Sequence, residues 1–262
     1  MAVRSLQAEV ETAMQAVRSS PEAIEPRMAL FQLAAVTGNW ARARSQLETM
    51  ARLDAECAVL ARTYTRLIDA EAVRGRVFAG EEQPVVFGAP PAWLAMTARA
   101  LALNRTGDAA GAHALRETAR EATPARGGTL DGSDFAWIAD ADPRIGAALE
   151  VVIDGQYRWL PFEHLVELRA RPPKAMRDLV WQPVTLVLAN GSELAAFVPG
   201  RYPGSEGSGD DAIRLARETR WVENGTEQWG LGQRLLSTDQ DDYALLDVRR
   251  LRLADSAAGD DG

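Results

Sequence analysis

Apolar residues in the first half of the chain recur at the spacing of amphipathic helices. Between residues 3 and 19 they fall every three or four positions, which predicts one helix with a single apolar stripe. A second helix is predicted from about residue 25 to Gly38, and a third begins at Trp40. A long helix follows from Cys57 to about Phe78.

Two passages have the pattern of a tetratricopeptide helix pair, in which a glycine turn joins two helices that approach closely through small residues. The turn glycines are Gly38 and Gly107, and their separation of 69 residues is roughly twice the 34-residue period of such repeats. A Gly/Pro-rich loop from Gly80 to Pro91 interrupts the pattern between them. We therefore predict that residues 1–126 form an irregular, TPR-like helical solenoid of about six helices.

The period changes after Pro124. Residues 127–148 are rich in Gly and Asp and are predicted to be a linker or docking segment, and from residue 149 the apolar pattern has the period of two that is typical of strands. The dipeptides Asp154-Gly155 and Asn190-Gly191 predict type I′ hairpin turns, because both positions of such a turn need positive φ. Strands are predicted at residues 149–153, 157–160, 164–168, 184–188, 194–198, 229–236 and 243–251.

These patterns give an α+β fold class with an N-terminal solenoid and a smaller, β-rich α+β domain. The predicted units are a helical domain at residues 1–126, a linker at 127–148, a β-rich domain at 149–254 and a disordered tail at 255–262. Two short helices are expected inside the β-rich unit, one after Pro173 and one after Asp210. Because the apolar period and the charge balance change at the same place, we expect the two halves to be separable.

The net charge of −8 is distributed unevenly along the chain. Residues 1–126 carry 15 arginines and 14 acidic residues, whereas residues 127–262 carry 14 basic and 23 acidic residues. The cations are scattered among carboxylates in both halves, and this argues against nucleic acid as a partner. The composition leaves the oligomeric state open.

Cysteine usage and hydropathy indicate the compartment. Cys57 is the single cysteine, so an internal disulfide cannot form and a reducing environment is expected. No stretch approaches 18 apolar residues, and the first eleven residues contain charges where a signal peptide has its apolar region. We therefore expect a cytoplasmic protein with no membrane association.

Sequence motifs for catalysis or cofactor binding are weak. The sequence has no phosphate-binding P-loop, no dinucleotide fingerprint and no zinc-protease helix, and Gly230-Leu-Gly232 is a two-glycine turn with no features of a phosphate cradle. The two histidines, His113 and His164, are expected to be structural, and the aspartates of residues 131–142 lack the spacing of a calcium loop. We therefore predict no cofactor, no metal site and no enzymatic activity.

Two other function classes stay open at this point. The alternative is a small hydrolase-like enzyme that uses an acidic cluster in the C-terminal half, with Asp140, Asp142, Arg177 and Asp178 as its polar residues. A pocket in which these side chains converge would favour that alternative. A third possibility is a purely structural subunit of a large complex, which would expose a large apolar patch.

A solenoid without catalytic groups is expected to bind a helix or peptide in its groove. We place this groove near the boundary between the two halves, with Phe78, Phe87, Trp93 and Leu94 as candidate partner-binding residues. Because the second half is strongly acidic, a basic flank on the incoming helix would be steered toward this boundary.

A series of Trp, Pro and Gly motifs runs through most of the chain. In order, they are Val77-Phe-Ala-Gly80, Pro90-Pro-Ala-Trp93, Asp131-Gly132, Phe135-Ala-Trp137, Ala139-Asp-Ala-Asp-Pro-Arg144, Gly155-Gln-Tyr157, Trp159-Leu-Pro-Phe-Glu163, Arg171-Pro-Pro-Lys174, Arg177-Asp-Leu-Val-Trp181, Phe197-Val-Pro199, Arg201-Tyr-Pro-Gly-Ser205, Asp210-Asp-Ala212, Arg214-Leu215 and Gly230-Leu-Gly-Gln-Arg234. The series resembles the ImpE/TagJ family, accessory proteins of bacterial type VI secretion.

The resemblance implies a cytoplasmic, non-enzymatic adaptor. Its implied partner is the N-terminal helix of the small contractile-sheath subunit (TssB), and through that helix the protein would affect sheath assembly or its recycling by the ClpV ATPase, an indirect link. The resemblance supplies no catalytic residues. The identity of this partner follows from the resemblance alone, whereas a helix-binding groove is expected from the residue pattern as well.

Overall fold

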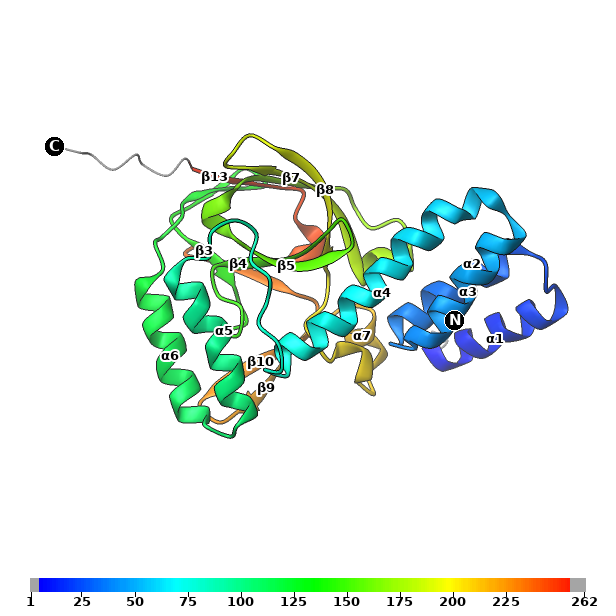
Figure 1. Cartoon of the computed structure of the whole chain (residues 1–262), viewed down its shortest axis with the longest axis horizontal. Helices are drawn as coiled ribbons and strands as arrows, with labels where there is room; N and C mark the ends of the chain where they lie inside the picture. Colours follow the sequence, from blue (N-terminus) through cyan, green and yellow to red (C-terminus); the bar gives the residue numbers. More distant parts are fainter. Residues whose placement is uncertain (1–4, 255–262) are drawn as a thin grey trace.

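The computed structural model describes residues 5–254, with helices in the first half and strands predominating in the second (Figure 1). This arrangement confirms the α+β class, while the tail predicted at 255–262 lies outside the described residues. Within the described part, no helix has both the length and the apolar character needed to cross a bilayer. The helices of the first half are α1 (Leu6–Ser19), α2 (Ile24–Val36), α3 (Trp40–Leu53), the short η1 (Ala55–Cys57), α4 (Ala58–Phe78), α5 (Ala92–Arg105) and α6 (Ala109–Ala122).

Local capping fixes where the helix pairs begin and turn. Asn39 caps α3 by accepting a hydrogen bond from the Arg42 amide at 3.1 Å, and Asp108 caps α6 in the same way. The residues just before these caps, Gly38 and Gly107, have φ values of 68° and 84°, which favour glycine and turn the chain from one helix into the next. The predicted helix pairs α2/α3 and α5/α6 are therefore confirmed.

The two pairs do not stack on one another as successive repeats of a solenoid. In Figure 1, α1–α3 lie at one end of α4, and the hairpin of α5 and α6 lies beyond the other end. Helix α4 has 21 residues and is therefore about 31 Å long. Its Tyr64 packs on Trp181 and Phe197 of the sheet, at ring-centroid distances of 5.9 and 6.0 Å. The sheet thus occupies a side of α4 where another helix pair would stack, and the TPR-like solenoid is not confirmed.

Within residues 5–254, eight antiparallel strands form the main sheet, in the order β2-β1-β13-β6-β7-β8-β4-β5. Strands β9 and β10 form a separate ribbon, and β3, β11 and β12 form a three-stranded sheet. The strands are β1 (Gly128–Leu130), β2 (Ser133–Phe135), β3 (Ile138–Asp140), β4 (Ala148–Ile153), β5 (Gln156–Pro161), β6 (Leu165–Ala170), β7 (Trp181–Leu188), β8 (Glu193–Pro199), β9 (Thr219–Asn224), β10 (Glu227–Gly232), β11 (Leu235–Thr238), β12 (Asp242–Ala244) and β13 (Arg250–Leu253). The segment predicted to be a linker, 127–148, therefore contributes three strands to two sheets.

The connections between strands follow local turn chemistry. Asp154 and Gly155 both have positive φ, 52° and 77°, as expected for the type I′ turn between β4 and β5. Between β7 and β8, only Gly191 has positive φ, and the Asn190 side chain instead accepts a hydrogen bond from the Ser192 amide at 3.0 Å. The hairpin predicted there is confirmed, but its turn is not of type I′. The short helices expected in this half are η3 (Met176–Leu179) and α7 (Asp211–Arg214).

The main sheet has an apolar core on each face. Leu149, Val151 and Leu160 belong to a cluster formed within the β-rich half, while Val152 and Trp159 of the same two strands belong to a cluster that includes the helices. The alternation follows from the period of two in a strand, and all six residues of β4 are buried. The second cluster runs across residue 126, so the proposed boundary marks a change of secondary structure while packing continues across it.

Candidate functional site

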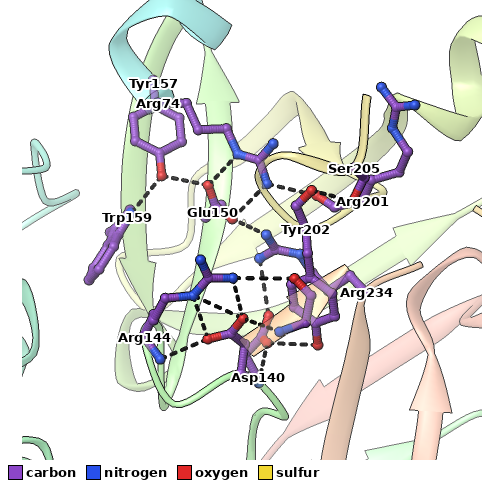
Figure 2. A network of polar contacts seen from close by, with 12 residues as sticks. Arg74, Asp140, Arg144, Glu150, Tyr157, Trp159, Arg201, Tyr202, Ser205 and Arg234 are labelled. Carbon is purple, nitrogen blue, oxygen red and sulfur yellow. Dashed lines mark hydrogen bonds and ion pairs between the residues drawn. The ribbon is translucent and has the colours of Figure 1, made fainter. Parts of the chain in front are cut away.

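Glu150, in the middle of β4, lies at the centre of a buried network of charged side chains (Figure 2). Arg74 of α4 binds its carboxylate with two nitrogens, at 2.7 and 3.1 Å. Arg234 donates to the same carboxylate, and the Tyr157 hydroxyl donates to it at 2.5 Å. Three segments that are distant in the sequence therefore meet at this one carboxylate.

Arg234 also links Glu150 to a pair of acids, Asp140 at the end of β3 and Asp142 two residues later. Its other terminal nitrogen lies 3.1 Å from Asp140, which accepts a hydrogen bond from the Tyr202 hydroxyl at 3.1 Å. Asp142 is held by Arg144 at 2.5 to 3.1 Å and accepts from the Gly230 amide at 2.9 Å. Both carboxylates are fully engaged by groups of the protein itself.

The network also connects the sheet to the first helices. Arg74 donates to the backbone carbonyl of Arg201 at 2.7 Å, and the Arg201 guanidinium donates to the carbonyl of Val36 at the end of α2, also at 2.7 Å. Because hydrogen bonds to a charged group are stronger than neutral ones, these contacts fix α2 and α4 on the sheet. The buried charged network, as it is called below, consists of Arg74, Asp140, Asp142, Arg144, Glu150, Arg201 and Arg234.

Burial changes the acid–base properties of these groups. It raises the pKa of Asp140 to about 6, although Arg234 acts in the opposite direction. Burial also lowers the pKa of Arg234 and of Arg201 to about 10. Arg201 and Arg234 therefore stay charged near neutral pH, whereas Asp140 titrates close to it.

Several of the Trp, Pro and Gly motifs identified in the sequence meet in this network. They contribute Asp140, Asp142, Arg144, Tyr157, Trp159, Arg201, Tyr202, Ser205 and Arg234 (Figure 2). Sequence reasoning did not find Arg74 or Glu150. The available signal for Glu150 was an ionisable residue in the centre of an otherwise apolar predicted strand, a position that requires a buried partner.

The residues of the hydrolase-like alternative do not form one cluster. Asp140 and Asp142 belong to the buried charged network, whereas Arg177 donates to the Tyr64 hydroxyl at 2.9 Å. Asp178 accepts from the backbone amides of Lys174 and Ala175, at 2.9 and 3.1 Å. Among residues 5–254, no three His, Cys, Asp or Glu side chains gather as a possible metal site. The geometry therefore gives this alternative no shared pocket.

A cavity of about 470 Å³ lies where the two halves of the chain meet. Trp93 of α5 and Arg116 and Arg120 of α6 line one wall, and Trp137, Asp140 and Ser237 line the wall formed by β3, β11 and the residue before β3. We call it the boundary pocket. Its volume is within the range of sites that hold one or two large side chains or a small ligand.

The cations on the helical wall of the boundary pocket already have carboxylate partners. Arg116 lies 2.7 Å from Glu227 of β10, and Arg120 lies 2.8 Å from Glu117. Burial alone would raise the pKa of Glu227, but hydrogen bonds from Arg116 bring it below its usual value. This wall therefore carries paired charges and apolar surface, which suits an apolar side chain better than a charged substrate.

Two tryptophans lie at the boundary pocket in different states. Trp93 is 4% exposed, and its indole N–H has no acceptor among the described residues. Trp137 is 40% exposed, one of the few large apolar side chains of the described chain that face solvent. An exposed tryptophan beside a cavity is a common anchor for protein partners.

The structure does not bring the four predicted partner-binding residues together. Trp93 lines the boundary pocket, but the next residue, Leu94, is completely buried in the core. Phe78 packs on Trp159 at 6.1 Å and lies under the Arg144 guanidinium. Phe87 lines a different cavity, beside β4 and β5. Sequence reasoning missed Trp137 as a site residue, although it singled out the segment around it.

The raised pKa of Asp140 predicts how stability depends on pH. Its pKa is about 6 in the folded state and about 3.9 in an unfolded chain, so the folded state binds more protons between these values. The free energy of unfolding should therefore rise by about 1 kcal/mol when the pH falls from 7 to 5. Urea unfolding at both pH values measures this. Asp140→Asn should lack the increase, and an equal increase in that variant would contradict the assignment.

Residues 132–252 match the model of the family described as ImpE protein. Over 235 residues, the chain is 46% identical to a Pseudomonas aeruginosa protein named type VI secretion system accessory component TagJ, covering 90% of this chain and 83% of that protein. The crystal structure of protein VPA1032 from Vibrio parahaemolyticus has the same fold, with a TM-score of 0.87, 22% identity and coverage of 97% of this chain and 95% of that one.

Proposed function

The chain belongs to the ImpE family, and from that premise we propose that it is a non-enzymatic adaptor of type VI secretion that binds the N-terminal helix of the small contractile-sheath subunit, TssB. The similar Pseudomonas aeruginosa protein is named as an accessory component of that secretion system, which supports an accessory role. By holding this helix, the protein would affect how the sheath assembles and how the ClpV ATPase recycles it.

The observation that carries the proposal is the character of the boundary pocket. It combines an exposed tryptophan with apolar surface, and the cations on its helical wall are already neutralised by Glu117 and Glu227. Asp140, at its floor, is held by Arg234 and Tyr202. These features support binding of an apolar side chain.

An amphipathic helix is the ligand that fits a site of this size at the junction of two elements. Such a helix presents apolar side chains at positions i, i+3, i+4 and i+7, and a cavity of about 470 Å³ has room for more than one of them. Burial of these side chains removes exposed apolar area of the partner from water. Of the partner-binding residues predicted from the sequence, Trp93 lines the boundary pocket, while Leu94 is buried in the core.

Calorimetric titration tests the proposal. A synthetic peptide of about the first 20 residues of the cognate sheath subunit is titrated into the full chain, and a peptide of the same composition in scrambled order is the control. We expect a Kd of about 1 µM or tighter for the first peptide, which corresponds to about −8 kcal/mol, and no heat for the second. No binding of the native-order peptide, together with no co-purification of the intact subunit, would overturn the adaptor role.

A further inference from the structure

An acidic turn borders the boundary pocket. It consists of the turn after β11 and the first residue of β12, residues 239–242, and contains Asp239, Asp241 and Asp242. Asp239 accepts a hydrogen bond from the Ala136 amide at 2.7 Å, next to Trp137, and the Ser237 hydroxyl in the pocket wall donates to Asp242. These two contacts attach the acidic turn to the rim of the pocket.

The carboxylates of this turn differ from those on the opposite wall. None of the three forms an ion pair within residues 5–254, whereas Glu117 and Glu227 are each paired with an arginine of α6. The hydrogen bond from the Ala136 amide holds the pKa of Asp239 below its usual range, so that it stays ionised. The acidic turn at the rim of the pocket therefore carries three carboxylates without an ion-pair partner among residues 5–254.

Trp137 lines the pocket and directly follows Ala136, whose amide is bonded to the acidic turn. It lies in the segment between β2 and β3, where the hydrogen bond from Ala136 to Asp239 fixes the backbone of its neighbour. A tryptophan held by the backbone loses little conformational entropy when it is covered by a partner. Trp93 lines the same pocket from the helical side.

We infer that the boundary pocket and the acidic turn form one docking surface for a basic amphipathic helix. Its apolar side chains would cover Trp137 and enter the pocket, and its Lys or Arg side chains would face the acidic turn. Charge complementarity favours a basic helix, because its cations would pair with the three carboxylates. A neutral helix would leave these carboxylates unpaired, and an acidic helix would be repelled by them. Side chains three or four positions apart on a helix are about 5–6 Å apart. One helix can therefore place an apolar side chain in the pocket and a Lys or Arg side chain at the acidic turn.

This inference rests on the proposed function for the source of the helix, which is the sheath subunit. It adds the chemistry that recognises the helix and the residues that bind it. Because unpaired surface charges attract over roughly a Debye length, about 10 Å at 0.1 M salt, the acidic turn should speed association mainly at low ionic strength.

The test uses two variants of the full chain with matched controls. Trp137→Ala removes the anchor, and Val59→Ala is its control because Val59 is 64% exposed on α4, away from the pocket. The double variant Asp241→Asn, Asp242→Asn removes two charges, and Glu22→Gln, Glu56→Gln removes two exposed charges from the helical half. Thermal unfolding shows whether each variant is folded.

We expect Trp137→Ala to weaken binding of the sheath peptide at least tenfold, as for a central anchor residue. The double aspartate variant should bind several-fold more weakly at low salt and should show a smaller salt dependence, while both controls stay within twofold of the parent protein. If the parent binds the peptide and both pocket variants bind it equally well, the docking surface is wrong and the adaptor role stands.

A second probe separates the two proposals. If the parent does not bind the sheath peptide, the proposed function fails, and a designed Leu/Lys amphipathic helix is then titrated. Binding of this helix that is lost in Trp137→Ala would support the docking surface, and no binding would overturn it. Self-association of the parent that disappears in Trp137→Ala, measured by sedimentation, would instead assign the surface to a second copy of the chain.

Discussion

Replacing Glu150 by Gln is expected to lower the free energy of unfolding by about 3–5 kcal/mol. Glu150 is fully buried and accepts hydrogen bonds from Arg74, Arg234 and Tyr157. Glutamine has the same size, but it lacks the charge and presents an amide N–H₂ to two guanidinium groups that can only donate. The two arginines would then be buried with too little negative charge around them.

An exposed ion pair provides the matched control. Arg169 and Glu193 lie 2.8 Å apart, with side chains 42% and 61% exposed, and Glu193→Gln should change the free energy of unfolding by no more than about 1 kcal/mol. Urea unfolding followed by tryptophan fluorescence and by circular dichroism measures both variants. A Glu150→Gln protein as stable as the Glu193→Gln protein would contradict the role assigned to the network.

The buried charged network connects helix α4 to a wall of the boundary pocket. Apolar side chains of similar volume could stabilise the same space equally well, so its charges are best explained by the orientation they impose. Arg74 fixes α4 on the sheet through Glu150, and Arg234 connects that contact to Asp140, which lines the boundary pocket. The network therefore extends from the helices to one wall of the pocket.

The elements that were predicted from the sequence are those with local signals. Helix α3 begins at Asn39 because its side chain caps the first turn, and Gly38 allows the left-handed turn before it. Asp154 and Gly155 similarly determine the β4–β5 hairpin within two residues. In each case the residues that determine the element lie within a few positions of it in the sequence.

The elements that were missed depend on residues far away in the sequence. Strand β1 has three residues and pairs with β13, where Gly128 is opposite Leu253, and β3 pairs with β11. Three residues show no measurable period, so the segment 127–148 was predicted to be a linker. The solenoid is not confirmed for a related reason, since the sheet that packs on α4 is built from the other half of the chain.

The candidate site could be predicted only in part, for the same reason. Its position at the junction of the halves followed from the change of period, and Trp93 does line the pocket there. Leu94 was chosen with it, but adjacent helix positions point about 100° apart, and Leu94 faces the core. Trp137 and the acidic turn are about 100 residues apart in the sequence and meet only because β3 pairs with β11.

Gly232→Ala is the second substitution for which a large effect is expected. Gly232 has a φ of 90°, and a Cβ added there would overlap the backbone carbonyl oxygen of Glu218. That oxygen also accepts a hydrogen bond from the Gln233 amide at 2.9 Å, so it cannot move away without breaking a contact of the same turn. Backbone strain and steric overlap together should reduce the free energy of unfolding by about 3 kcal/mol or more.

Two other glycines separate these contributions. Gly191 has a φ of 81° with open space at its Cβ position, so Gly191→Ala should show strain alone, about 1 kcal/mol. Gly207 has neither constraint, and Gly207→Ala should stay within about 0.5 kcal/mol of the parent protein in urea unfolding. If Gly232→Ala costs no more than Gly191→Ala, the close approach to Glu218 is not restrictive. If Gly232→Ala is instead the most destabilising of the three variants, close packing explains why glycine stands on both sides of Leu231. At Gly230, too, an added Cβ would overlap the ring of Tyr202, whose hydroxyl donates to Asp140.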